Sequence, residues 1–269
     1  MNEWWAVFYG MIQGITEFLP ISSSGHLALI PRFFELKDPG TLFDLTMHVG
    51  TALAILVYFK RDVAVLFRGT KNLLLRKEQD APNRLFALNF ILATIASVVF
   101  ILLIKDAALL YGRFSQFIAF NLIFFGLLMY WSDRKRPLPL SMETSSQKKI
   151  SLMIGLAQAL AIFPGVSRSG ITITTGRFSG LSRLEASRFS FLLSLPIIFA
   201  SFIYKSKDII SSGGTGGANF WHMLIGVGVS FLVGILTIHY FLKFLAKVGL
   251  GIYTVYRVLL GIGILVIAA

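Results

Sequence analysis

A short polar run near the N-terminus combines residue types that can carry out acid–base chemistry. It contains a carboxylate, Glu17, and further on an imidazole, His26, with three hydroxyls between them at Ser22, Ser23 and Ser24. A hydroxyl beside a carboxylate and an imidazole is the usual environment of an activated nucleophile or a general base. The flanking segments are apolar, and a charged side chain at membrane depth is costly and normally marks a function.

A second polar run, in the middle of the chain, suits the binding of an anion. Arg168 lies there between Ser167 and Ser169, and a proline-glycine pair precedes them. The planar guanidinium of arginine matches phosphate oxygens, and the N-terminus of a helix beginning here would offer free N–H groups to the same anion. The less specific interpretation is that the serines only cap helices and that Arg168 pairs structurally with Glu17.

The two polar runs are copies of one pattern. Aligned without a gap, residues 10–25 and 155–170 agree at Gly10, Gln13, Phe18, Ser22, Ser24 and Gly25, which meet Gly155, Gln158, Phe163, Ser167, Ser169 and Gly170. Two matched copies, with Arg168 in one where the other has Ser23, favour an anion site over simple helix caps. The candidate ligand-binding residues are Gln13, Ser22, Ser24, Gly25, Ser167, Ser169, Gly170 and Thr172.

The elements that position these runs are predicted to be membrane helices. The 269 residues are 55% hydrophobic with a mean hydropathy of +0.75, and apolar stretches of about 18 or more residues are typical of helices that cross a bilayer. His48 falls inside the first such stretch and is interpreted as a satisfied core residue. The six candidate spans are Leu45–Tyr58 with Asp44 before it, Leu85–Ile104, Phe114–Trp131, Phe189–Ile203, Phe220–Leu242 and Leu250–Ala268.

The segments that contain the polar runs are too short to cross a bilayer. From Trp4 to Leu19 a helix covers about 24 Å, whereas the hydrocarbon core is about 30 Å thick, and Pro20 then disfavours its continuation. Each run is therefore predicted to form a helix, a break and a second helix that returns to the same side. Three spans follow each run, so the second half would be inverted relative to the first. We predict one all-α membrane domain, 1–269, with six transmembrane helices, two re-entrant segments and an inverted-topology repeat of about 1–132 and 150–269.

The net charge of +12 is assigned to membrane orientation, and no nucleic-acid partner is expected. Basic residues gather in two predicted loops, around 60–84 and 134–149, which the positive-inside rule places in the cytoplasm. The first polar run then enters the membrane from outside, and the site is expected to open to the outer face. The chain has no cysteine, which excludes disulfides and thiolate metal sites.

Three stretches carry a resemblance to a known family. They are QGITEFLPISSSGH at 13–26, PGVSRSGIT at 164–172 and SFLLSLP at 190–196. They resemble the bacterial undecaprenyl-pyrophosphate phosphatases, the bacitracin-resistance family, and the resemblance runs the length of the chain. It implies an inner-membrane hydrolase that removes the terminal phosphate of a polyprenyl diphosphate lipid and so recycles the carrier for peptidoglycan synthesis. It also implies that the active-site residues are Glu17, Ser23, His26 and Arg168.

The sequence leaves several alternatives open. Ser23 or His26 is the nucleophile, or His26 activates water, while Glu17 orients the base or helps to bind a divalent cation such as Mg²⁺ or Ca²⁺. Gln13 stands where many members of the family have Glu, so a tight metal site that needs two carboxylates is not expected to be complete. A homodimer is compatible with the sequence. The alternative function is an inverted-repeat transporter or a lipid flippase.

Overall fold

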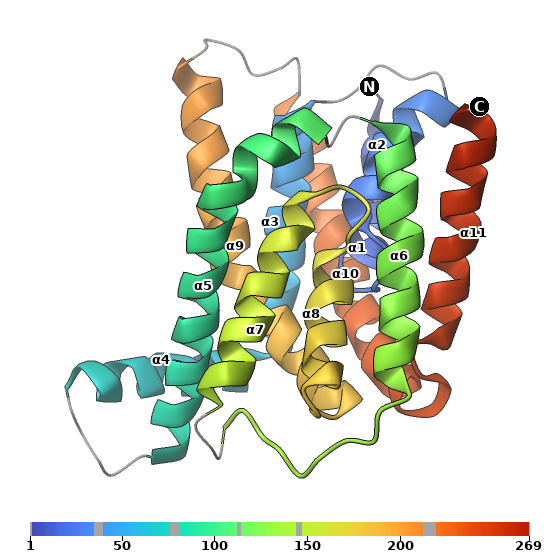
Figure 1. The fold of residues 1–269 in the computed structure, drawn as a ribbon. Coiled ribbons are helices and arrows are strands. Elements are labelled where there is room, and N and C mark those ends of the chain that lie inside the picture. Colours follow the sequence, from blue (N-terminus) through green and yellow to red (C-terminus); the bar gives the residue numbers. More distant parts are fainter. Residues whose placement is uncertain are drawn as a thin grey trace.

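The computed structural model describes residues 2–34, 40–75, 81–111, 114–143, 147–211 and 219–268, and all regular elements among them are helices. Most helices run side by side in one bundle (Figure 1). The all-α prediction is therefore confirmed for this part of the chain. The helices are α1 (Glu3–Thr16), α2 (Ser23–Phe33), α3 (Thr41–Tyr58), α4 (Lys60–Leu74), α5 (Ala81–Tyr111), α6 (Ser115–Asp133), α7 (Lys148–Ala159), the short η1 (Leu160–Ile162), α8 (Arg168–Phe178), α9 (Arg183–Ser211), α10 (Phe220–Val248) and α11 (Gly251–Ala268).

Four described helices, α5, α6, α9 and α10, are by themselves long and apolar enough to cross a membrane. They coincide with four of the six predicted spans. The predicted span Leu45–Tyr58 lies in α3, which qualifies only together with α4, from which it is bent by 84°. The predicted span Leu250–Ala268 lies in α11, which is a shorter apolar helix. The chain is thus a multi-pass helical membrane protein, while the total of six spans stays a prediction.

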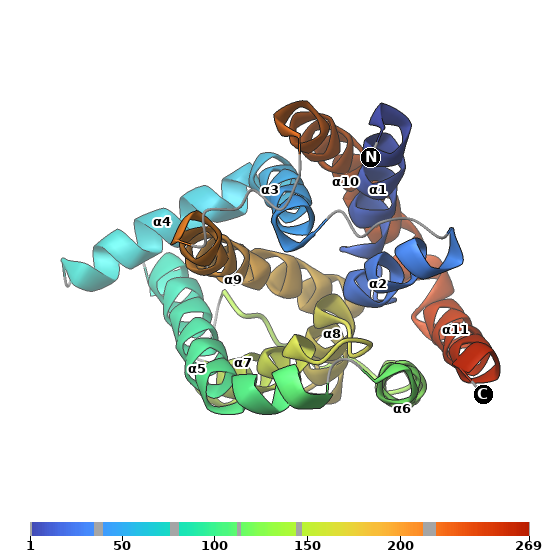
Figure 2. The ribbon, with the colours of Figure 1, turned by 90° about the horizontal axis from the view of Figure 1, so that it is seen from above.

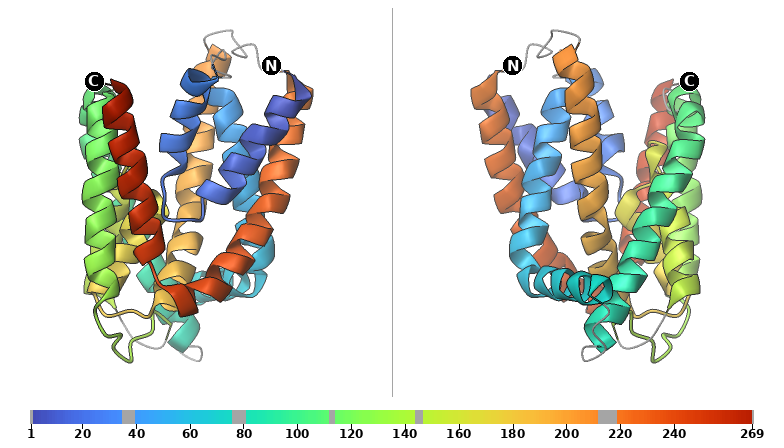
Figure 3. Two further views of the ribbon diagram at one scale, coloured as in Figure 1. Left: turned by 90° about the vertical axis from the view of Figure 1, so that its right-hand side faces the viewer. Right: turned by 90° about the vertical axis from the view of Figure 1, so that its left-hand side faces the viewer.

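Two helix–break–helix segments place their breaks inside the bundle. The helices α1 and α2 extend from the end where both termini lie, whereas α7 and α8 extend from the opposite end (Figures 1 and 3). Each break contains a serine with left-handed backbone, with φ of 75° at Ser22 and 70° at Ser167, and these are the two non-glycine residues with positive φ in the described ranges. Such a conformation costs about 1–3 kcal/mol and persists where the surroundings impose it. The matched strain therefore marks equivalent positions in the two polar runs.

Each segment packs on a helix from the other half of the chain, α1 on α10 and α7 on α5 (Figure 2). Equivalent glycines allow both contacts. A Cβ at Gly10 would lie 3.0 Å from the carbonyl oxygen of Gly226, and one at Gly155 would lie 2.2 Å from that of Ala93. A larger residue would push the helices apart at either place. These matched contacts support the predicted division into two halves, which itself stays a prediction.

The described residues of the two basic segments lie at the same end of the bundle, where α4 runs across the other helices and the connection that follows α6 passes, described over 134–143 (Figure 1). Ion pairs hold this end together. Arg183 donates to both carboxylate oxygens of Asp133, at 2.6 and 2.9 Å, and Arg188 donates to Asp62 of α4 and to Glu143 of the connection. Segments 76–80 and 144–146 lie outside the described residues.

Candidate active site

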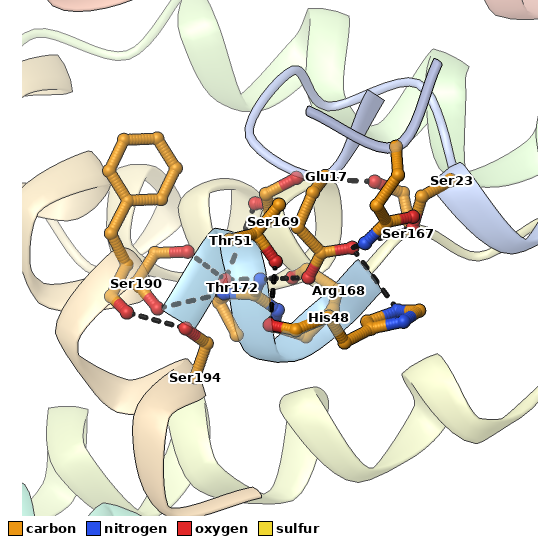
Figure 4. A network of polar contacts seen from close by, with 12 residues as sticks. Glu17, Ser23, His48, Thr51, Ser167, Arg168, Ser169, Thr172, Ser190 and Ser194 are labelled. Carbon is orange, nitrogen blue, oxygen red and sulfur yellow. Dashed lines mark hydrogen bonds and ion pairs between the residues drawn. The ribbon is translucent and has the colours of Figure 1, made fainter. Parts of the chain in front are cut away.

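The two breaks meet, and side chains from both polar runs gather where they touch (Figure 4). The hydroxyl of Ser169 donates a hydrogen bond to the carbonyl oxygen of Leu19 at 3.1 Å. Arg168 reaches Glu17 at the end of α1. Ser169 and Arg168 open α8, so the start of this helix lies against the first break. Residues far apart in the sequence thus form one polar cluster.

Glu17 is the centre of this cluster, and its side chain is only 6% exposed. Arg168 donates to its Oε1 at 2.5 Å, while the Ser23 hydroxyl and the Gln13 amide donate to its Oε2 at 2.8 and 3.1 Å. The Nε2 atom of His48 lies 3.5 Å from the same Oε2. Glu17 therefore pairs with Arg168 through one oxygen, as its structural interpretation expects. Its other oxygen contacts Ser23, as a role in acid–base chemistry requires. The carboxylate is within reach of the Ser23 proton.

Arg168 is the first residue of α8, so its side chain lies at a helix N-terminus, where free N–H groups favour an anion. Its Nη1 donates to the carbonyl oxygen of Ser190 in α9 at 3.3 Å, while Nη2 binds Glu17. The side chain is 14% exposed. Two neighbouring elements therefore orient the guanidinium, which can exchange its carboxylate partner for phosphate oxygens.

One serine in each break caps the helix that follows. The hydroxyl of Ser22 accepts from the N–H of Gly25 at 3.4 Å, and that of Ser167 accepts from the N–H of Gly170 at 3.2 Å. Both serines are buried, so these hydroxyls stabilise the breaks and the helix ends. Ser24, by contrast, is exposed. Direct contact of these residues with a ligand stays a prediction.

Two further candidates of the second run link helices to each other. Ser169 is buried and its hydroxyl binds the first break. The hydroxyl of Thr172 donates to the carbonyl oxygen of Arg168 at 2.8 Å and shares a hydrogen bond with the hydroxyl of Ser190 at 2.6 Å. These contacts fix α8 against the first break and against α9. Both residues therefore help to position Arg168.

The ring of His26 is turned toward α11 rather than toward Glu17. Its Nδ1 is 2.7 Å from the carbonyl oxygen of Ser22, and its Nε2 is 2.6 Å from the hydroxyl of Tyr256. The two rings stack, with centroids 5.6 Å apart. Because a carbonyl oxygen only accepts, Nδ1 carries the ring proton of neutral His26 and Nε2 accepts from Tyr256. The predicted catalytic residue His26 is thus at the edge of the cluster that surrounds Glu17.

Arg257 of α11 joins the two breaks through hydrogen bonds to both of them. Its side chain is fully buried, and in the described chain no carboxylate forms an ion pair with it. All of its hydrogen bonds go to backbone carbonyl oxygens of the two breaks and of α6. The acceptors are Pro20 at 3.2 Å, Gly165 at 2.9 Å, Val166 at 3.0 Å, Leu122 at 3.1 Å and Asn121 at 3.2 Å.

The match to a family model decides the assignment. The model described as bacitracin resistance protein BacA matches residues 6–263. The chain belongs to the bacitracin resistance protein family. This is the undecaprenyl pyrophosphate phosphatase family, so the resemblance carried by the motifs is confirmed. The match covers both breaks and the whole polar cluster of this family member.

Two ionisable residues that contact Glu17 or the breaks in this family member are not among the site residues predicted from the sequence. His48 is assigned by its sequence to the core, and the structure places it beside Glu17. Arg257 is not singled out at all. The signal for both is the one that identifies Glu17, namely an ionisable side chain inside an apolar segment. This signal marks His48 and Arg257 as well, but it does not say which residues they contact.

The side chains of the cluster do not fit a resident metal ion. In the ranges that the structure describes, no group of three or more His, Cys, Asp or Glu side chains comes together. Glu17 is the carboxylate of the cluster, and Arg168 binds one of its oxygens. Among the described residues the amide oxygen of Gln13 has no hydrogen-bond partner, but Mg²⁺ and Ca²⁺ require several oxygen ligands. The divalent cation considered from the sequence stays an untested prediction, and we assign no step to it.

Proposed function

We propose that this member of the bacitracin resistance protein family hydrolyses undecaprenyl diphosphate to undecaprenyl phosphate and inorganic phosphate in the bacterial cytoplasmic membrane. The reaction would recycle the lipid carrier for peptidoglycan synthesis and confer resistance to bacitracin. Family membership supports a membrane phosphatase. The observation that carries the proposal is the meeting of Arg168, at a helix N-terminus, with the hydrogen-bonded pair of Ser23 and Glu17 inside an apolar bundle.

Substrate binding in this proposal replaces the ion pair between Arg168 and Glu17. Without a ligand these two charges neutralise each other at 2.5 Å. A diphosphate offers Arg168 several charged oxygens, and the N–H groups at the start of α8 bind the same anion. Glu17 then keeps its hydrogen bond from Ser23 and is free to act as a base. The prenyl tail stays in the hydrocarbon beside the bundle.

Ser23 is the nucleophile in this proposal. Its proton passes to Oε2 of Glu17 along the 2.8 Å hydrogen bond as Oγ bonds to the terminal phosphorus, and the bridging oxygen leaves on the lipid monophosphate. Water then attacks the phosphoserine, Glu17 returns the proton to Oγ, and the phosphate leaves with both hydrogens of the water. Arg168 stabilises the charge on the transferred group in both steps.

The access side follows from the distribution of charge. The end that carries α4 and the connection that follows α6 is the basic one, so we propose that it faces the cytoplasm. The helices α1 and α2 then enter from the outer face, and the diphosphate reaches the cluster from that side.

Phosphate release from a polyprenyl diphosphate by the detergent-purified protein tests the proposal. The wild type is expected to release phosphate, and Ser23→Ala to lose this activity while it stays folded. Ser24→Ala is the matched variant and is expected to lose less, because no hydrogen bond joins Ser24 to Glu17 in the described structure. Absence of phosphate release by the wild type would refute the phosphatase. Transfer of the lipid between leaflets without hydrolysis would favour the transporter or flippase instead.

A further inference from the structure

His48 approaches the cluster from α3, and the chemistry of its neighbours fixes the tautomer of its ring. The Nδ1 atom is 2.8 Å from the backbone carbonyl oxygen of Asp44. A carbonyl oxygen only accepts, so Nδ1 carries a proton, and the neutral ring has a bare lone pair at Nε2. This Nε2 points at Oε2 of Glu17, 3.5 Å away (Figure 4). Oε2 is the oxygen to which Ser23 donates.

Close packing of α3 on α10 holds His48 in this position. The hydroxyl of Ser230 donates to the carbonyl oxygen of Met47 at 3.0 Å. On the next turn, a Cβ at Gly50 would lie 2.1 Å from the same hydroxyl oxygen. The helix backbone on both sides of His48 is therefore in direct contact with α10. A rigid element thus presents the ring to Glu17.

The comparison with His26 shows what is particular about His48. In both residues Nδ1 is bound to a backbone carbonyl oxygen one turn earlier. At His26 the Nε2 atom faces the hydroxyl of Tyr256, which can donate a proton into a hydrogen bond. At His48 the Nε2 atom faces a carboxylate, which cannot. Neutral His48 and ionised Glu17 are therefore two acceptors in contact, and the pair becomes attractive when it takes up one proton.

We propose that His48 acts through Glu17: its Nε2 accepts the proton that Glu17 removes from Ser23. The proton moves from Oγ of Ser23 to Oε2 of Glu17 and on to Nε2 of His48. Glu17 is then a carboxylate again, and the imidazolium keeps its Nδ1–H on the carbonyl oxygen of Asp44. The same path in reverse returns the proton to Ser23. This inference rests on the proposed function, because it assigns the proton of that reaction.

One charged group contacts His48 directly in the described structure. Among the residues that the structure describes, Glu17 faces His48 from α1, and Arg168 of α8 binds the far oxygen of Glu17. The packed helices α9 and α10 contribute hydroxyls, at Ser190, Ser194 and Ser230. Two other charged or titratable groups of these helices are at the far end of α3: His239 of α10 lies beside Tyr58, and Arg188 of α9 binds Asp62 of α4. Tyr58 is about 15 Å along the helix from His48.

The first test is the pH dependence of phosphate release by His48→Gln, with His239→Gln as the matched control. Glutamine cannot take up a proton, so kcat is expected to fall by about 100-fold. His48 can accept the proton only when it is neutral, so the acid limb of the pH profile of kcat should change in His48→Gln, where Glu17 alone has to be ionised. A structural role would lower kcat and leave the acid limb unchanged. His239→Gln should keep both the rate and the profile of the wild type.

The second test needs no enzymatic activity. The chain has four histidines, so ring-¹⁵N spectra of the wild-type protein in nanodiscs can be assigned with single substitutions. In Glu17→Gln the ring-¹⁵N shifts of His48 should change, because its Nε2 no longer faces a carboxylate with which it can share a proton, while those of His222 and His239 stay the same. Unchanged ring-¹⁵N shifts at His48 would refute proton sharing. This result stands even if the wild type releases no phosphate, an outcome that would count against the proposed function alone.

Discussion

Replacing Arg168 with lysine keeps the positive charge and removes the planar guanidinium with its two terminal nitrogens. In the structure the guanidinium uses Nη2 for Glu17 at 2.5 Å and Nη1 for the carbonyl oxygen of Ser190 at 3.3 Å. A single ammonium nitrogen cannot hold both positions. On a bound diphosphate the variant should therefore lose one charge-assisted hydrogen bond, which contributes about 1.5–3 kcal/mol. The expected fall in kcat/KM is about 10- to 150-fold.

The assay is phosphate release by detergent-purified Arg168→Lys, with folding checked by thermal melting. Arg134→Lys serves as the control, because Arg134 is exposed and its side chain binds only the hydroxyl of Tyr130 in the described structure; its rate should equal that of the wild type. If Arg168→Lys also kept its rate to within roughly threefold, a simple charge at this position would suffice. The argument from a planar, two-nitrogen contact would then be wrong.

Three further outcomes are expected. Glu17→Gln should abolish phosphate release because an amide cannot act as a base, whereas Gln13→Ala removes one donor to Oε2 and should cost about 2 kcal/mol, or roughly 30-fold in rate; equal losses in two folded variants would contradict the single-carboxylate site. In this cysteine-free chain, a cysteine at Arg68 should react only with reagents that enter the cytoplasm, and one at Asn219 should react from outside; the reverse pattern would overturn the orientation. Asp133→Asn should lower the melting temperature, because the partly buried carboxylate accepts two hydrogen bonds from Arg183 and a charge-assisted hydrogen bond contributes about 1.5–3 kcal/mol; an unchanged melting curve would show that the cluster is not stabilising.

The breaks could be predicted because their signals are local. Pro20 ends a helix through its own ring, and a serine after it caps the next helix through its own hydroxyl. Both effects act within a few residues, and the structure has Ser22 and Ser167 as the N-caps. The contact between Glu17 and Arg168 was also foreseeable, since an isolated charge of either sign is costly at membrane depth.

The contact partners of His26 and His48 could not be predicted in the same way. His26 follows the serines directly, and its sequence position suggests a partner of Glu17, yet its ring stacks on Tyr256. His48 lies in an apolar helix far along the chain, and it reaches Glu17 because α3 packs on α10 in one particular register. Register between helices depends on complementary surfaces of distant segments. No short stretch of sequence contains that information.

The place of Arg257 in the last helix has a consequence for biosynthesis. A membrane protein inserts from its N-terminus, so both breaks are made well before α11 leaves the ribosome. The carbonyl oxygens of Pro20 and Gly165 receive their guanidinium partner only after α11 has been made. A nascent or C-terminally shortened chain carries the polar runs without the side chain that joins them. Insertion of α11 is thus the step that joins the two breaks, well after both have entered the membrane.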